Sequence, residues 1–175
     1  MSSPSILRLS AALHRITGAV IVLLPLAAVV MLGQGISAPD VVAARFPGLT
    51  ISPGPGTAVA AGLVGALPLA AAIYALVQMR ALFGLYRDGE ILTAASAARI
   101  QRIGQGLFAI ALLGPVTHTI QALILTWNNP PGQRALVIGL ESSLLGFLLA
   151  GALMILIGRV MVEAARMAEE NRSFV

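Results

Sequence analysis

The 175-residue sequence contains no cysteine, no lysine and little charge of either sign. Without cysteine, the chain can form neither a disulfide framework nor a thiolate metal site. Charged residues make up 10% of the chain, whereas a soluble domain carries about 25%. All eleven cations are arginines spread along the chain, which argues against a basic patch that binds nucleic acid directly.

Catalytic motifs are missing as well. The sequence has no nucleotide-binding loop, no metal-ligand helix motif, no nucleophile elbow and no pair of catalytic carboxylates. We therefore expect a protein that is not an enzyme and that needs no metal and no cofactor.

Long apolar segments dominate what is present. Hydrophobic residues make up 58% of the chain, and the mean hydropathy is +0.92. A membrane-spanning helix needs about 20 mostly apolar residues, and four segments meet this length, at about 13–32, 57–79, 105–127 and 135–158. The first is too long for the apolar core of a removable signal peptide. The sequence thus predicts an all-α, integral membrane four-helix bundle that forms a single membrane domain over residues 1–175.

The arginines predict the orientation of these spans. Nine of the eleven flank one side, and only Arg45 and Arg134 lie on the other. Because cytoplasmic loops carry an excess of Lys and Arg, we expect both termini and the 80–104 loop in the cytoplasm. The 33–56 and 128–134 loops should then face the exterior.

Both longer loops contain helix signals. In the outer loop, "DVVAARF" is expected to form one short helix at the interface. In the 80–104 loop, Thr93 is a predicted N-cap that follows a turn containing Asp88 and Glu90. The short helix after it would place Arg99 and Arg102 on one face. Lipid headgroups or a protein partner could bind these arginines, with Ile91, Leu92, Ile100 and Ile103 dipping into the acyl chains.

Two ionisable residues lie deep within the predicted spans, where they are costly and need a reason. His118 lies nine residues before Trp127, and Glu141 lies seven after Arg134. Both are therefore about 10–14 Å below the outer surface. We expect a His118–Glu141 contact, with nearby hydrogen-bonding groups at Gln121, Ser142 and Ser143. The pair could fix helix register, take part in ligand or proton binding, or be no pair at all if Glu141 reaches the outer interface.

A haem held by two histidines does not fit one chain. His14, the other histidine, is displaced from His118 by about 15 Å along the membrane normal, so only a haem shared between subunits would remain. Six small residues should instead allow close helix packing, and these are Gly62, Gly65, Gly139, Gly146, Gly151 and Gly158.

The last span runs on into a charged tail over residues 159–175. Glu163, Arg166 and Glu170 have the three- and four-residue spacings that stabilise an exposed helix. Met161 and Met167 keep apolar surface beside these charges. The tail could be a solvated helix end, pack on the 80–104 loop with Arg99 or Arg102 paired to its glutamates, or bind a partner.

Two segments resemble known families. "SAALHRITGAVIVLL" is similar to the first membrane helix of the cytochrome b anchor subunit of succinate dehydrogenases, through Ser10, His14, Arg15, Thr17 and Gly18. That family places these residue types near its quinone site, and its anchor subunit has three spans. In this chain the serine lies one residue further from the histidine than in that family, and no later histidine matches its haem ligand.

The second resemblance covers most of the chain from the second span onward. "LFGLYRDGEILTAASAARIQRIGQGL" and the closing "EAARMAEENRSFV" resemble a family of bacterial four-helix membrane proteins, domain of unknown function 2975. The first motif is carried by the run Asp88–Thr93, in which Leu92 replaces a common aromatic. The resemblance implies a multi-pass protein of the bacterial cytoplasmic (inner) membrane, often encoded beside a small helix-turn-helix regulator.

Three functional hypotheses follow. The first is a non-enzymatic interaction or regulatory protein whose cytoplasmic face contacts a partner, with that small regulator as a candidate. The second is an accessory membrane subunit of a redox or respiratory complex, near quinone or haem. The third is a small transporter or channel, which would need to oligomerise because four spans supply few polar groups. The bilayer and further copies of the chain are the remaining expected partners.

Overall fold

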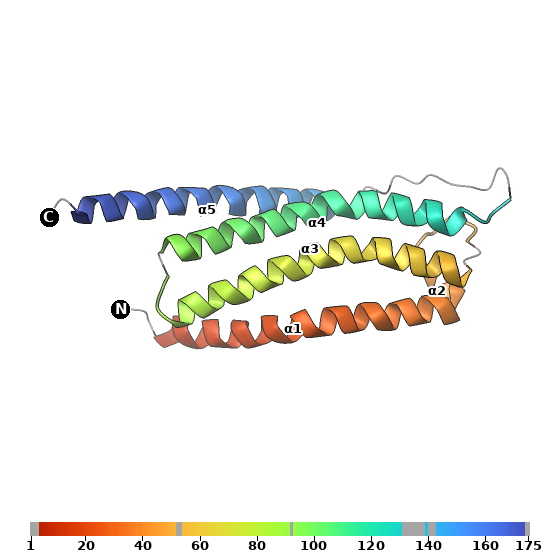
Figure 1. Cartoon of the computed structure of the whole chain (residues 1–175), viewed down its shortest axis with the longest axis horizontal. Helices are drawn as coiled ribbons and strands as arrows, with labels where there is room; N and C mark the ends of the chain where they lie inside the picture. Colours follow the sequence, from red (N-terminus) through yellow and green to blue (C-terminus); the bar gives the residue numbers. More distant parts are fainter. Residues whose placement is uncertain (1–3, 52–53, 92, 131–138, 140–142, 174–175) are drawn as a thin grey trace.

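The protein is a single layer of long helices (Figure 1). The computed structural model describes residues 4–51, 54–91, 93–130, 139 and 143–173, with side chains at 4–6, 39 and 168–173 outside the description. Its helices are α1 (Pro4–Ser37), α2 (Pro39–Ala43), α3 (Pro55–Arg87), α4 (Ala94–Thr126) and α5 (Ser143–Ser173). The four long helices contain apolar stretches long enough to cross a membrane. The expected all-α, multi-pass membrane fold is confirmed.

The helices lie side by side in the order of the chain. α1 packs on α3, α3 on α4 and α4 on α5, while in the described ranges α1 contacts neither α4 nor α5. Only 6–17% of the residues in each apolar window are buried inside the chain. Both faces of the layer therefore expose large aliphatic side chains, a surface that hydrocarbon, and not water, accommodates.

Glycines set the closest helix contacts. A Cβ on Gly104 would lie 2.7 Å from the Gly151 carbonyl oxygen, and one on Gly158 would lie 2.7 Å from the Gln101 amide nitrogen. On the other side of α4, a Cβ on Gly106 would lie 2.8 Å from the Ala75 Cβ. Such backbone approach is how membrane helices gain packing energy when no water drives them together.

Most of the six glycines named from the sequence do lie at close approaches. A Cβ would meet a neighbour within 3.0 Å at Gly62, Gly65, Gly151 and Gly158. It would also do so at Gly139, which lies outside the described helices, so a helix contact there stays a prediction. Gly146 is the exception, because nothing in the described structure lies within 4 Å of its Cβ position. The prediction of close packing at Gly146 was wrong, since this residue is on the exposed side of α5.

Four arginines, one on each long helix, lie at about the same level. The Arg80 side chain of α3 lies beside Gly18 of α1. Gly18 is three residues after Arg15, so Arg15 and Arg80 are less than one helical turn apart in level. Arg102 and Arg159 directly follow the Gln101–Gly158 contact between α4 and α5. We call Arg15, Arg80, Arg102 and Arg159 the arginine level.

The arginine level bounds a segment of membrane thickness. In α1, 22 residues separate Arg15 from the last residue, Ser37. In α3, 25 residues separate Arg80 from the first residue, Pro55, and in α4, 24 separate Arg102 from the last residue, Thr126. At 1.5 Å per residue this is about 33–38 Å, slightly more than a hydrocarbon core of about 30 Å. The arginine level thus fits one membrane interface, and the helices continue beyond it on the side where α1 begins and α5 ends (Figure 1).

The segment after Thr93 is not a separate interfacial helix. Thr93 does cap a helix, because its hydroxyl accepts a hydrogen bond from the Ser96 amide and the Ser96 hydroxyl accepts one from the Thr93 amide. That helix, however, continues through Gly104 and Gly106 into the third span as α4. The two glycines do not break it because they face α5 and α3 at close range.

This continuity changes the role of two isoleucines. Ile100 and Ile103 were expected to dip into the acyl chains, but they are 8% and 2% exposed and pack with Leu82 of α3. Met161 of α5 and Tyr86 of α3 pack against this cluster. The prediction of acyl-chain contact was wrong for both residues, which instead join three helices near and beyond the arginine level.

At the opposite end, the segment between α1 and α3 folds back onto the helices. The expected short helix is present as α2, and the chain after it places Phe46 in a cluster with Ala61, Ala122 and Leu125. The Asn129 side-chain amide donates a 2.6 Å hydrogen bond to the Thr50 carbonyl. This segment therefore packs over the ends of α3 and α4 that lie away from the arginine level.

Candidate functional site

The polar residues singled out from the sequence lie in two separate regions. His118 and Gln121 are on the C-terminal half of α4, close to the Phe46 cluster. The arginines and carboxylates of the 80–104 segment and the tail lie at the other end, near and beyond the arginine level. The histidines are divided likewise, since His14 contacts Arg80 and His118 contacts Phe46. One haem bridged by both histidines of one chain does not fit this separation.

His118 packs against an aromatic ring and lies close to Gly139. Its imidazole is 4.8 Å from the Phe46 ring, centroid to centroid, at an interplanar angle of 31°. A Cβ on Gly139 would lie 2.9 Å from His118 Nδ1. Nδ1 is buried, and no donor or acceptor in the described part of the chain reaches it. An orphaned buried nitrogen of this kind is costly.

Glu141, the predicted partner of His118, lies outside the described residues, as does Ser142. The His118–Glu141 contact therefore stays a prediction. Gln121 faces α3, where its amide donates a 2.9 Å hydrogen bond to the Ala61 carbonyl. Gly65 makes room for it, because a Cβ there would lie 2.6 Å from the Gln121 Nε2.

A half-open groove of about 260 Å³ lies beside His118, between α3, α4 and α5. Its walls combine apolar side chains with a few polar ones. The polar residues among them include Thr117, His118, Gln121 and Ser143, and the apolar ones include Pro68 and Phe147. In the described residues, no group of three or more metal-ligating side chains of the His, Cys, Asp or Glu type occurs here or elsewhere.

At the arginine end, Arg99 and Arg102 differ although they share a helix. Arg99 is half-buried, and its guanidinium donates a 2.7 Å hydrogen bond to Oε1 of Gln78, a residue of α3 that is 7% exposed. Arg102 is exposed. Arg99 thus links α4 to α3 through this hydrogen bond. Of the two arginines, only Arg102 has an exposed side chain.

The carboxylates of this end pair locally. Asp88 is the C-cap residue of α3 and forms a 3.4 Å ion pair with Arg87, with both side chains more than half exposed. Glu90 is exposed beyond the turn at Gly89, whose φ of +87° favours glycine. Glu163 and Arg166 form the expected intrahelical ion pair, with an N–O distance of 2.6 Å.

Two further parts of the tail prediction have different outcomes. The side chains of Glu169 and Glu170 lie outside the described residues, so their pairing stays a prediction. The helical continuation of the fourth span is confirmed, because α5 reaches Ser173.

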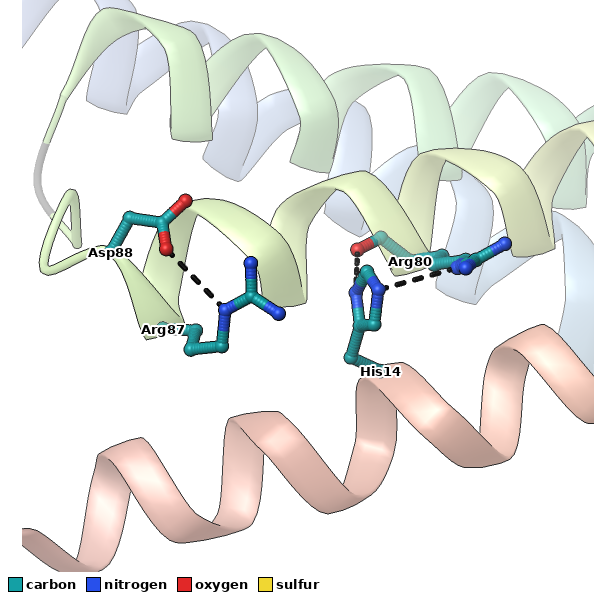
Figure 2. A network of polar contacts seen from close by, with 4 residues as sticks. All are labelled: His14, Arg80, Arg87 and Asp88. Carbon is teal, nitrogen blue, oxygen red and sulfur yellow. Dashed lines mark hydrogen bonds and ion pairs between the residues drawn. The ribbon is translucent and has the colours of Figure 1, made fainter.

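A pairing between α1 and α3 was missed by sequence reasoning. His14 Nδ1 lies 3.0 Å from the Arg80 carbonyl oxygen, and Arg80 Nε lies 3.4 Å from His14 Nε2 (Figure 2). The two contacts fit one neutral tautomer, with Nδ1–H donating to the carbonyl and Nε2 accepting from the guanidinium. The signal was present, since His14 lies near the start of the first predicted span and Arg80 directly follows the second. An antiparallel α1–α3 pair brings such residues to one level.

Comparisons with known proteins place the chain in a family. The family model described as "Protein of unknown function (DUF2975)" matches residues 34–174, which is well over half of the chain. The match begins after the Ser10–Gly18 segment, so it does not include the part that resembles the succinate dehydrogenase anchor. No curated protein and no solved structure matches the chain. The chain belongs to the family of unknown function DUF2975.

Proposed function

We propose that this protein is a non-enzymatic membrane protein of the bacterial inner membrane that docks a cytoplasmic protein on its arginine-side helix ends. The orientation rests on the nine arginines at that side against two at the other, by the positive-inside rule. The N-terminal end of α1 and the C-terminal end of α5 both lie on that side (Figure 1). The proposal is thus a multi-pass protein with both termini in the cytoplasm.

The observation that carries the proposal is the length of α5. Met161 packs against the Ile100–Ile103 cluster, but the helix continues twelve residues further to Ser173. This is about 18 Å, and Figure 1 shows α5 extending past the turn between α3 and α4. A short helix without tertiary packing is marginal in water, so a partner that packs along this end would stabilise it.

The chemistry of this helix end suits a protein surface better than lipid. Glu163 and Arg166 are exposed on it as an ion pair, and Met167 is 50% exposed beside them. Acidic side chains are not attracted to anionic headgroups, whereas an adaptable Met next to mixed charges is typical of binding surfaces. A small helix-turn-helix regulator is the candidate partner, and only the family resemblance suggests it.

Site-specific photo-crosslinking in native membranes tests the proposal. A photoreactive residue replaces Met167 in one variant and Leu149, a 71% exposed α5 residue in the apolar span, in the control variant. We expect a discrete protein adduct from position 167 that is absent from position 149. Deletion of residues 162–175 should abolish co-purification of the same protein. No adduct at position 167, or the same adduct at both positions, would refute docking on the α5 end.

The groove beside His118 favours a second candidate, a small oligomeric transporter or channel. It places polar side chains within the apolar span, where their burial costs free energy and where such residues often mark a substrate or ion pathway. Under this alternative, His118→Ala and Glu141→Gln should each abolish flux in proteoliposomes. Under the docking proposal, neither substitution should change the crosslink from position 167.

A further inference from the structure

We propose that the crossing of α1 and α3 at the arginine level binds a phosphate group through Arg80. The source of the phosphate is either the headgroup of an anionic lipid or a free phosphate ion. Arg80 is the ligand-binding residue, His14 orients it, and Gly18 leaves it room. This site is separate from the docking surface on α5.

The first argument is that Arg80 is held in place. His14 donates to the Arg80 backbone carbonyl at 3.0 Å, which fixes the imidazole against α3. The Nε2 of that ring is then 3.4 Å from the Arg80 Nε. The Arg80 side chain runs along α3 past the His14 ring (Figure 2). A Cβ on Gly18 of α1 would lie 3.4 Å from its Cζ. A Cβ at this distance makes ordinary van der Waals contact, so alanine would fit, whereas a side chain branched at Cβ, such as valine, would crowd the guanidinium.

The second argument is that its charge is not neutralised. The ion pairs among the described residues are Arg87–Asp88 and Arg166–Glu163, and the described partner of the Arg80 side chain is the imidazole of His14. With Nε facing His14, the two terminal nitrogens keep four N–H donors. A planar pair of such donors matches the oxygens of a phosphate in a bidentate arrangement.

The third argument is position. Arg80 belongs to the arginine level, where phosphate headgroups meet the hydrocarbon, and the exposed Arg15 adds a second positive charge one residue from His14. One turn toward the membrane centre, Val22 of α1 and Val77 of α3 are 68% and 43% exposed. They offer apolar surface to an acyl chain directly below the headgroup, which a lipid would use and a free ion would not.

Native mass spectrometry of the full-length protein in neutral detergent tests the site. The probes are phosphatidylglycerol, phosphatidylcholine and inorganic phosphate. Arg80→Gln is the test variant, and Arg159→Gln is the matched control, because it removes an exposed arginine of the same level at the far edge of the layer. We expect phosphatidylglycerol binding to weaken about tenfold or more in Arg80→Gln and to stay near the native value in Arg159→Gln.

Two further arms keep the test decisive. Gly18→Val retains Arg80 but displaces its guanidinium, so it should lose the same binding even if Arg80→Gln is poorly folded. Competition by millimolar inorganic phosphate would assign the site to a free ion, whereas its failure to compete would assign it to a lipid headgroup. Native-like phosphatidylglycerol binding by both Arg80→Gln and Gly18→Val, or an equal loss in Arg159→Gln, would overturn the proposal.

Discussion

Substitution of Gly151 by alanine should separate α4 from α5. A Cβ at this position would lie 2.8 Å from the Phe108 amide nitrogen and 2.9 Å from the Gly104 carbonyl oxygen, both of them backbone atoms of α4. Backbone cannot rotate out of the way as a side chain can. Gly146 supplies a matched control on the same helix, because in the described structure nothing lies within 4 Å of its Cβ position.

The size of the effect follows from these distances. Ordinary van der Waals contact begins at 3.4 Å, so the helices must move apart locally by about 0.6 Å. A gap of that size forfeits about a quarter to a half of the attraction of each atom pair along the contact, and overpacking of this kind costs about 1–3 kcal/mol. Both substitutions also gain about 1 kcal/mol of helix propensity. The difference between the variants is therefore the overpacking cost alone, about 1–3 kcal/mol.

Reversible denaturation in mixed detergent micelles, followed by helical circular dichroism, measures this difference. We expect Gly146→Ala to be about 1 kcal/mol more stable than the native protein, and Gly151→Ala to be about 1–3 kcal/mol less stable than Gly146→Ala. A Gly104→Ala variant and the double variant should be non-additive, because residues 104 and 151 face the same contact. Equal stability of Gly151→Ala and Gly146→Ala would show that the close α4–α5 approach does not hold in the protein.

Three other substitutions test single hydrogen bonds, all by the same denaturation assay. Thr93→Ala removes the N-cap of α4 and should cost about 1 kcal/mol, whereas Thr93→Ser should restore most of it. Gln121→Leu deletes the bond to the Ala61 carbonyl and should cost about 0.6 kcal/mol, as inter-helix hydrogen bonds in membranes do; a loss of several kcal/mol would mean that Gln121 has another role. Gln78→Leu leaves the half-buried Arg99 guanidinium without its acceptor and should cost about 1–3 kcal/mol, which an added Arg99→Leu should largely relieve.

Much of the architecture could be predicted because hydrocarbon imposes simple rules. Four apolar runs of about 20 residues leave few alternatives to four membrane helices, and helices of this kind are present. The Thr93 cap and the helical tail could also be predicted, because helix caps and i to i+3 charge pairs depend only on residues close in the sequence.

The site was harder to predict because its contacts cross between helices. The pairing of His14 with Arg80 joins residues 66 positions apart, and that of Arg99 with Gln78 joins residues 21 apart. Neither has a motif of its own. Ile100 and Ile103 show the same difficulty, because an apolar residue near an interface has the same local sequence whether it faces lipid or a neighbouring helix.

The sequence by itself therefore determined that the chain spans a membrane with helices and which ends carry the arginines, because chain length, hydropathy and charge are properties of single segments. Only the tertiary structure decided that the helices form an open row, that Gly104, Gly151 and Gly158 are contact points while Gly146 is not, and that His14 holds Arg80. Those outcomes depend on how each helix is rotated and how deep it lies against its neighbour. Rotation and depth are fixed by the fit of facing backbones and side chains, which no single segment contains.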